Sequence, residues 1–126
     1  MRALLLAAGF GTRLRPLTET VPKCLVPVQG KPLMAYWFEL LFAAGFERVL
    51  ANTHYLPEVV RSYVTQSPWS AQVDLVHEDP ILGTGGTVLA NAVWFGNKPF
   101  LVAHADNLTV FDAHRFVEQH QQRPPD

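Results

Sequence analysis

An apolar run that ends between two glycines opens the chain: Ala3-Leu4-Leu5-Leu6-Ala7-Ala8-Gly9-Phe10-Gly11. A short apolar run bounded by glycine predicts a buried strand over residues 3–8 that ends in a glycine loop. Prolines follow this loop at positions 16, 22 and 27. Because each proline removes an amide donor and fixes φ, we expect residues 9–31 to form an extended, ordered loop with little regular structure.

Helix and strand patterns alternate over the rest of the chain. Pro32 and Pro57 are each placed to begin a helix. The glycine turn Gly83–Gly86 leads into a helix through Val93, and Asp112 is a suitable N-cap for the last helix. The helix from Pro57 is expected to turn four side chains toward the core: Val59, Val60, Tyr63 and Val64. The expected strands between these helices are Val49–Ala51, Val73–Val76 and Phe100–Ala103.

Strands separated by helices favour parallel pairing through crossover connections. The sequence therefore predicts a three-layer α/β/α, Rossmann-like sheet that is mostly parallel. Ligands of such sheets bind at the carboxyl ends of the strands, so functional residues should lie on the loops that follow each strand. Since the chain ends just where a further strand is expected, we interpret residues 1–126 as the N-terminal part of a larger domain.

Composition excludes several classes of protein. The 126 residues are 48% hydrophobic, which is enough apolar content for the core of one domain. No run approaches the roughly 20 apolar residues of a membrane-spanning helix, and the first residues lack a signal-peptide cleavage pattern, so we expect a cytoplasmic protein without membrane contact. The single cysteine, Cys24, excludes a disulfide framework and a cysteine-cluster zinc site.

Charge is distributed unevenly, although ten basic and eleven acidic residues give a net charge of −1. This balance argues against nucleic-acid binding by bulk electrostatics. Residues 1–31 nevertheless hold five basic residues and a single acid, Glu19. Most of these cations lie in a segment rich in Gly, Pro and Thr, where a loop can hold them around a compact anion. A polyphosphate is the natural candidate.

The glycine loop carries the groups that bind phosphate. Gly9 and Gly11 let backbone amides approach phosphate oxygens. Thr12 adds a hydroxyl donor, and Arg13 supplies a planar fork suited to a diphosphate. The segment is not a Walker A loop, because no Gly-Lys-Ser/Thr follows at the required distance. It is not the dinucleotide fingerprint either, because the third glycine would fall at Leu14.

This segment resembles the signature of the sugar-1-phosphate nucleotidyltransferases, or nucleotide-sugar pyrophosphorylases, which runs Gly-x-Gly-Thr-Arg-x-x-Pro and then Pro-Lys. The matching positions are Gly9, Gly11, Thr12, Arg13, Pro16, Pro22 and Lys23. Pro27-Val28 and Lys31-Pro32 continue the family's usual next phrase. Glu78 before the Leu82–Gly86 phrase and Asp106 after the last expected strand also fit. The resemblance covers nearly the whole chain.

The resemblance implies transfer of a nucleotidyl group from a nucleoside triphosphate to a sugar 1-phosphate, with release of pyrophosphate and no covalent enzyme intermediate. By resemblance, Arg13 would hold the departing pyrophosphate and Lys23 would stabilise charge on the α-phosphate. Asp106 would hold Mg²⁺, for which a carboxylate at a strand end is a suitable ligand. The nucleotide-binding residues implied in this way are Leu6, Ala7, Ala8, Gly9, Gly11, Thr12, Arg13, Lys23, Glu78 and Gly83.

Glu78 occupies the position that lies near the edge of the base in this family. A carboxylate only accepts hydrogen bonds, so it suits N1–H and the amino group of guanine, or less fully N3–H of thymine or uracil. The phrase Glu78–Gly86 also looks most like the guanylyl members that act on mannose 1-phosphate. GTP and mannose 1-phosphate are therefore the favoured substrates.

Three alternative functions are compatible with the same sequence. Thymidylyl or uridylyl transfer within the same family is one, and a cytidylyl or molybdopterin-guanylyl transferase with a similar glycine loop is another. A third is a non-catalytic, nucleotide-sensing regulatory subunit. One departure from the pattern is Ala105 before Asp106, where the family commonly has glycine. Because the later part of family members supplies a second metal carboxylate and most sugar contacts, we expect these 126 residues alone to show little or no turnover.

The histidines and the cysteine are interpreted as structural or solvent-exposed residues. The five histidines lack metal-ligand spacing, although His104 precedes Asp106 by two residues near the expected site. Cys24 follows Lys23, but no partner base is evident, so we interpret it as a packing residue. A free sheet edge near Phe100–Ala103 would expose unpaired strand amides, which makes the chain a candidate for self-association.

Overall fold

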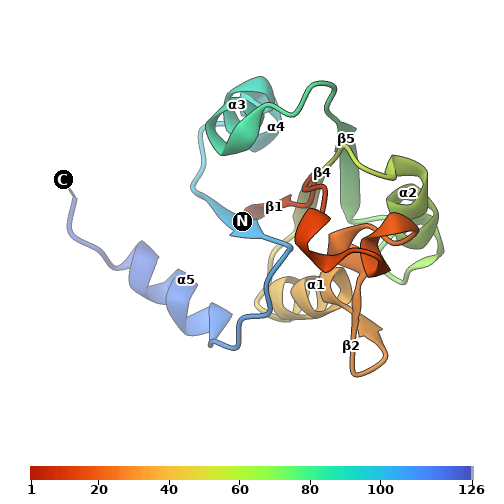
Figure 1. Cartoon of the computed structure of the whole chain (residues 1–126). Coiled ribbons are helices and arrows are strands. Elements are labelled where there is room, and N and C mark those ends of the chain that lie inside the picture. The colour runs from red at the N-terminus through yellow and green to blue at the C-terminus, as the bar shows by residue number, and fades with distance from the viewer. Residues whose placement is uncertain (126) are drawn as a thin grey trace.

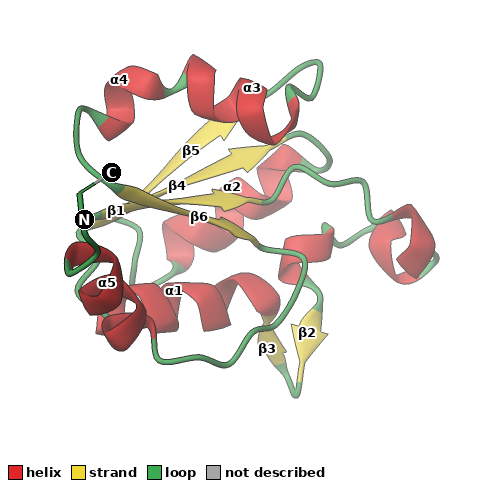
Figure 2. Cartoon of the chain, turned by 90° about the vertical axis from the view of Figure 1, so that its left-hand side faces the viewer, coloured by secondary structure: helices red, strands yellow, loops and turns green. Residues whose placement is uncertain are grey.

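The computed structural model describes residues 1–125 and shows an α/β fold (Figure 1). A parallel four-stranded sheet has the strand order β5-β4-β1-β6, with helices on both faces (Figure 2). The strands are β1 (Arg2–Leu6), β4 (Arg48–Thr53), β5 (Val73–His77) and β6 (Phe100–His104). The helices are α1 (Leu33–Ala43), α2 (Pro57–Gln66), α3 (Gly83–Ala90), α4 (Ala92–Phe95) and α5 (Ala113–Gln121). The predicted three-layer fold is confirmed.

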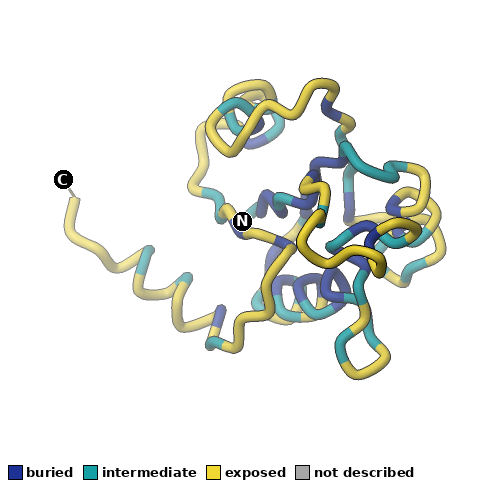
Figure 3. Tube along the Cα trace, in the orientation of Figure 1, coloured by how far each residue is buried: buried dark blue, intermediate teal, exposed yellow. Residues whose placement is uncertain are grey.

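Strand β1 is buried on both faces, which explains its unbroken apolar run. Ala3 and Leu5 belong to the larger hydrophobic cluster, where they pack with Phe38 of α1. Leu4 belongs to a smaller cluster on the opposite face with Phe95 of α4. Successive residues of a strand point to opposite faces, so a central parallel strand needs apolar side chains throughout. Figure 3 shows this burial along the middle of the sheet.

The strand register brings the predicted functional loops to one edge of the sheet. Leu6, at the end of β1, pairs with Asn52 of β4 on one side and with His104 of β6 on the other. Thr53 pairs in turn with His77 at the end of β5. The segments after β1, β5 and β6 therefore leave the sheet close together, as parallel pairing requires.

Residues 9–31 contain more regular structure than predicted. They form three single-turn 3₁₀ helices, η1 (Thr12–Leu14), η2 (Leu17–Glu19) and η3 (Lys23–Leu25), and an antiparallel hairpin of β2 (Pro27–Val28) and β3 (Lys31–Pro32).

The turn of this hairpin consists of Gln29, with φ 50°, and Gly30, with φ 78°. Two successive residues with positive φ give the twist that a tight hairpin needs. Glutamine replaces the usual Asn or Asp before the glycine, so the ordinary sequence signal for a hairpin is missing.

Two helix predictions were wrong in detail. The helix expected after a glycine turn at Gly83–Gly86 instead begins at Gly83, and it is interrupted before Val93, because α3 ends at Ala90 and α4 begins at Ala92. At the break, the side-chain amide of Asn91 donates to the Thr87 carbonyl at 2.8 Å, and such local bonds compete with a continuous helix. In α2, Val60 is buried but Val59 is exposed, because consecutive helical residues point about 100° apart.

The last part of the chain follows its predictions. The Asp112 carboxylate accepts a hydrogen bond from the Arg115 amide at 2.9 Å, so it caps α5 as expected. Among the described strands, β6 pairs with β1 alone, which leaves its outer edge free. None of the helices within residues 1–125 has the length and apolar character that crossing a bilayer requires.

Candidate active site

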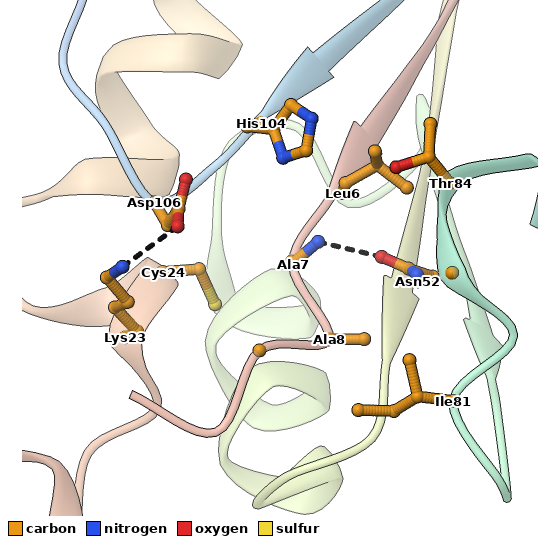
Figure 4. Close-up of a pocket in the computed structure, with 12 residues that line it drawn as sticks. Leu6, Ala7, Ala8, Lys23, Cys24, Asn52, Ile81, Thr84, His104 and Asp106 are labelled. Atoms are coloured by element: carbon orange, nitrogen blue, oxygen red, sulfur yellow. Dashed lines mark hydrogen bonds and ion pairs between the residues drawn. The ribbon is translucent and has the colours of Figure 1, made fainter. Parts of the chain in front are cut away.

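A cavity of about 160 Å³ lies at the carboxyl edge of the sheet (Figure 4). Seven residues predicted from the sequence line it: Leu6, Ala7, Ala8, Gly9, Lys23, Gly83 and Asp106. Small-molecule pockets commonly enclose roughly 300–1,000 Å³. The cavity therefore encloses only part of a ligand as large as a nucleoside triphosphate.

Lys23 and Asp106 face each other at this cavity (Figure 4). Lys23 lies in η3 and Asp106 follows β6, and the distance from Nζ to Oδ2 is 2.8 Å. The hydrogen bond from Lys23 holds the pKa of Asp106 below its ordinary value, against partial burial, which raises it. The carboxylate is therefore ionised at neutral pH. The two side chains are 29% and 46% exposed, so a ligand can reach both charges.

Gly11 is required by the packing of the loop that carries Lys23. Its φ is 65°, and a Cβ at this position would lie 2.9 Å from Thr18 Cγ2 and 3.2 Å from Lys23 Cβ. The Thr18 hydroxyl donates to the Gly11 carbonyl at 2.6 Å, which holds the turn closed. Only glycine fits both the backbone conformation and the space. A Cβ on Gly9, by contrast, would meet no atom within 4 Å, so that stretch of backbone is open to a ligand.

The other predicted phosphate ligands, Thr12 and Arg13, lie in η1 and are exposed. Neither belongs to the part of the described chain that lines the cavity. The structure thus brings Lys23 to the cavity but leaves Arg13 outside it. A single ligand that contacts both cations must extend beyond the cavity toward η1.

Glu78, which the family resemblance places near the edge of the base, is only 3% exposed. Its carboxylate accepts hydrogen bonds from the Asn52 side-chain amide at 3.2 Å, from the Leu82 amide at 3.1 Å and from the Thr87 hydroxyl. A buried carboxylate needs such donors to replace its hydration. Glu78 therefore lies behind the residues that line the cavity and is not one of them.

Comparison with known proteins identifies the family. Residues 2–126 match the model of the nucleotidyl transferase family. The chain belongs to this family. It is 36% identical over 126 residues to mannose-1-phosphate guanylyltransferase catalytic subunit beta of Danio rerio, covering 97% of this chain and 35% of that protein. It is 33% identical over 135 residues to UTP–glucose-1-phosphate uridylyltransferase of Synechocystis sp., covering 98% of this chain and 35% of the relative.

Solved structures of sugar nucleotidyltransferases share the fold of this nucleotidyl transferase chain. HddC from Yersinia pseudotuberculosis complexed with GMP-PN superposes with a TM-score of 0.80 at 28% identity, covering 96% of this chain and 54% of that one. UDP-glucose pyrophosphorylase complexed with UDP-glucose gives a TM-score of 0.81 at 26% identity, covering 96% and 53%. The chain spans about a third of the length of the curated relatives and about half of these solved chains.

Asn52 is the main residue lining the cavity that was not predicted from the sequence. It is buried near the end of β4, and its side-chain oxygen accepts a hydrogen bond from the Ala7 amide at 2.7 Å. A signal existed in the sequence, because a polar residue directly after the apolar run of a predicted parallel strand falls at the ligand-binding edge of the sheet.

Cys24 and His104 also line the cavity. Burial raises the pKa of the Cys24 thiol to about 12, so the sulfur stays protonated at neutral pH and is not a nucleophile. His104 is exposed at the end of β6, so its imidazole is accessible to a ligand. Ile81 and Thr84, which lie on either side of Leu82-Gly83, complete the wall next to α3.

Proposed function

We propose that the protein containing this chain transfers the nucleotidyl group of a nucleoside triphosphate, preferably GTP, to a sugar 1-phosphate, preferably mannose 1-phosphate. The products are a nucleotide-sugar and pyrophosphate. One observation carries the proposal: the Lys23–Asp106 pair lies at a cavity lined by the open backbone of residues 7–9. The chain spans only part of its relatives, so the nucleotide site is assigned to these residues and the complete reaction to the whole protein.

The reaction needs positioning and charge neutralisation more than covalent chemistry. A phosphate oxygen of the sugar 1-phosphate attacks the α-phosphorus, and the bond to the β-phosphate oxygen breaks. Pyrophosphate leaves with the bonding electron pair. Because two anions must approach each other, a cation placed at the α-phosphate stabilises the transition state. Lys23 serves this purpose, since the packing of Gly11 holds its loop in place before a ligand arrives.

Arg13 is the proposed partner of the departing pyrophosphate. The cavity is too small for a whole nucleoside triphosphate, so part of the ligand projects from it. With the nucleoside against the Ala7–Gly9 backbone and Gly83, the β- and γ-phosphates extend toward η1. Arg13 is exposed there, and its planar guanidinium suits a diphosphate.

Asp106 is the proposed ligand of Mg²⁺. Its carboxylate is a hard oxygen donor, ionised and partly exposed, which fits this metal. The described residues contain no group of three or more His, Cys, Asp or Glu side chains that could hold a metal ion. One carboxylate suffices for a metal that arrives with the phosphates, because Mg²⁺ usually combines one or two carboxylates with substrate oxygens. Bound Mg²⁺ would neutralise phosphate charge, and Lys23 would exchange Asp106 for a phosphate oxygen.

The preference for GTP is supported by the names of the relatives. Mannose-1-phosphate guanylyltransferases of Danio rerio and Mycobacterium tuberculosis are 36% and 34% identical to the chain. The solved HddC structure is described as a complex with GMP-PN. Uridylyl transfer is the second candidate, because the Synechocystis uridylyltransferase is 33% identical. Cytoplasmic location and self-association through the edge of β6 stay predictions.

Calorimetric titration of the chain with GTP, UTP, dTTP, CTP and ATP in the presence of Mg²⁺ tests the nucleotide site. We expect GTP to bind most tightly. Tighter binding of UTP would replace the guanylyl assignment with the uridylyl one, and no binding of any nucleotide would remove the site.

A pyrophosphate-release assay with GTP, Mg²⁺ and mannose 1-phosphate tests the reaction. We expect little or no turnover from these residues alone and turnover from the whole protein. Release by the chain alone would contradict the assignment of sugar contacts to a later part of the protein. No product from the whole protein with any pair of substrates would favour the regulatory-subunit alternative.

A further inference from the structure

The buried side chain of Asn52 joins two walls of the cavity. Its Oδ1 accepts from the Ala7 amide at 2.7 Å, and its Nδ2 donates to Glu78 Oε1 at 3.2 Å. The Thr87 hydroxyl oxygen lies 3.4 Å from the same nitrogen. Because a backbone amide can only donate, the oxygen of Asn52 must face Ala7 and its nitrogen must face Glu78. The orientation of this side chain is therefore fixed by its partners.

The carboxylate of Glu78 is committed to the protein. Oε1 accepts from Asn52 and from the Thr87 hydroxyl, and Oε2 accepts from the Leu82 amide at 3.1 Å. The backbone is held too, because the Glu78 amide donates to the Thr53 carbonyl at 2.8 Å. Glu78 is buried and does not line the cavity. No carboxylate oxygen is thus presented to a ligand.

These bonds form a continuous connection from Ala7 through Asn52 and Glu78 to Leu82, which we term the brace. The brace joins the ends of β1, β4 and β5 to the residue before α3. Ala7 lines one side of the cavity, and Gly83, next to Leu82, lines another. A buried polar network whose members are all satisfied fixes the spacing of the elements it connects.

We propose that Asn52 and Glu78 are positioning residues, which set the distance between the two walls of the nucleotide site, and that Glu78 does not itself contact the base. Recognition of the base then falls to groups that line the cavity, namely Thr84 and the backbone at Gly83. The identity of the ligand rests on the proposed function, but the brace itself does not. Direct contact between Glu78 and guanine, which the family resemblance implies, is the competing arrangement.

Amide hydrogen exchange in the nucleotide-free chain tests the brace. Glu78→Gln keeps the shape of the side chain but replaces one acceptor oxygen with a donor, so either the Leu82 amide at Oε2 or the Asn52 amide and the Thr87 hydroxyl at Oε1 lose that acceptor. We expect exchange at Leu82 and also at Ala7 to accelerate by about tenfold, because losing a hydrogen bond to a charged group costs about that factor or more. Asp79→Asn removes the same charge from the exposed neighbouring residue and should change neither rate. An unchanged rate at Ala7 in Glu78→Gln would overturn the coupling.

The wild-type chain provides a second measurement in case Glu78→Gln does not fold. The Ala7 amide follows the last residue of β1, and the Leu82 amide precedes α3, so neither belongs to a strand or helix. The brace predicts slow exchange at both. Exchange at the rate of an exposed loop amide at either position would overturn the proposal.

Binding of GTP and ITP separates positioning from direct contact. ITP lacks the 2-amino group, so a carboxylate that accepts from this group must distinguish the two nucleotides. If Glu78 only positions the walls, Glu78→Gln weakens both nucleotides by the same factor, about tenfold, and leaves the ratio of their Kd values within about twofold of wild type. A ratio that collapses toward one would overturn the proposal in favour of direct contact. Failure of the wild-type chain to bind any nucleotide would remove the proposed function, while the exchange measurement would still decide the brace.

Discussion

The two segments that flank the cavity use their polar side chains in opposite ways. Between residues 9 and 23, Thr12 and Arg13 are exposed and Lys23 forms a partly exposed ion pair. Between residues 78 and 87, Glu78 and Thr87 are buried and bonded to each other. The first segment leaves its basic side chains available to a ligand, whereas the second uses the carboxylate of Glu78 to hold the protein together. Substitutions in the two segments should therefore separate binding from stability.

The largest expected effect is on stability, from Glu78→Ala. This change removes the acceptor of the buried Asn52 amide and of the partly buried Leu82 amide, and it leaves the Thr87 hydroxyl with the Gly83 carbonyl alone. We expect the free energy of unfolding to fall by about 3 kcal/mol, as measured by urea denaturation. Asp79→Ala, the matched control, should change it by less than about 0.5 kcal/mol because its side chain is exposed. A loss below about 1 kcal/mol for Glu78→Ala would erase the difference between the two segments.

Lys23→Ala should produce the largest effect on binding. Losing one charge-assisted contact to a phosphate costs about 2 kcal/mol, so we expect the Kd for GTP to rise about 30-fold in calorimetric titration. The free energy of unfolding should change by less than about 1 kcal/mol, because the pair with Asp106 is partly exposed. Lys31→Ala removes the same charge from a lysine that pairs with Glu39 and should leave GTP binding unchanged. Equal Kd values for the Lys23 variant and wild type would show that the cavity is not the phosphate site.

The same contrast explains which parts of the molecule were predictable. The central strand of the sheet could be predicted from the apolar run of residues 3–8, because a short strand covered on both faces has apolar side chains throughout. The break at Asn91 and the hairpin at Gln29–Gly30 carry weak signals, since Asn is tolerated in helices and Gln is unusual in tight turns.

The candidate site divides in the same way. Lys23 and Asp106 were recognised because they lie in a spaced motif and at a strand end. The hydrogen bond between the side chains of Asn52 and Glu78 joins residues 26 positions apart in the sequence. The register of β4 and β5 brings these two residues together. One sequence does not reveal which polar side chain such a register turns inward. The inward orientation of Asn52 and Glu78 was therefore harder to predict than the positions of Lys23 and Asp106.

Arg13→Ala tests whether the exposed segment binds phosphate outside the cavity. If Arg13 binds the pyrophosphate part of the ligand outside the cavity, its loss should raise the Kd for GTP about tenfold but leave the Kd for GMP unchanged. Stability should not change, because the side chain is exposed. Arg15→Ala, two residues along, is the control and should alter GTP binding less than about twofold. An equal loss for GTP and GMP would place Arg13 near the α-phosphate, and no loss for GTP would separate it from the site.

The smallest expected effect concerns the pH dependence of the Lys23–Asp106 pair. In the folded chain, the hydrogen bond from Lys23 holds the pKa of Asp106 below its ordinary value of 3.8. A carboxyl group whose pKa is lowered by folding stabilises the folded state at pH values above its pKa in the unfolded chain. This stabilisation is lost as the pH falls through the lower pKa of the folded chain. Asp106→Asn should therefore reduce the free energy of unfolding at about pH 5–7, by less than about 1 kcal/mol because the pair is partly exposed. The difference from wild type should shrink below pH 3.8 and should be smaller in a Lys23→Ala background, because Lys23 is the main cause of the lowered pKa. A pH-dependent difference of undiminished size without Lys23 would assign the stabilisation to another partner of Asp106, such as His104.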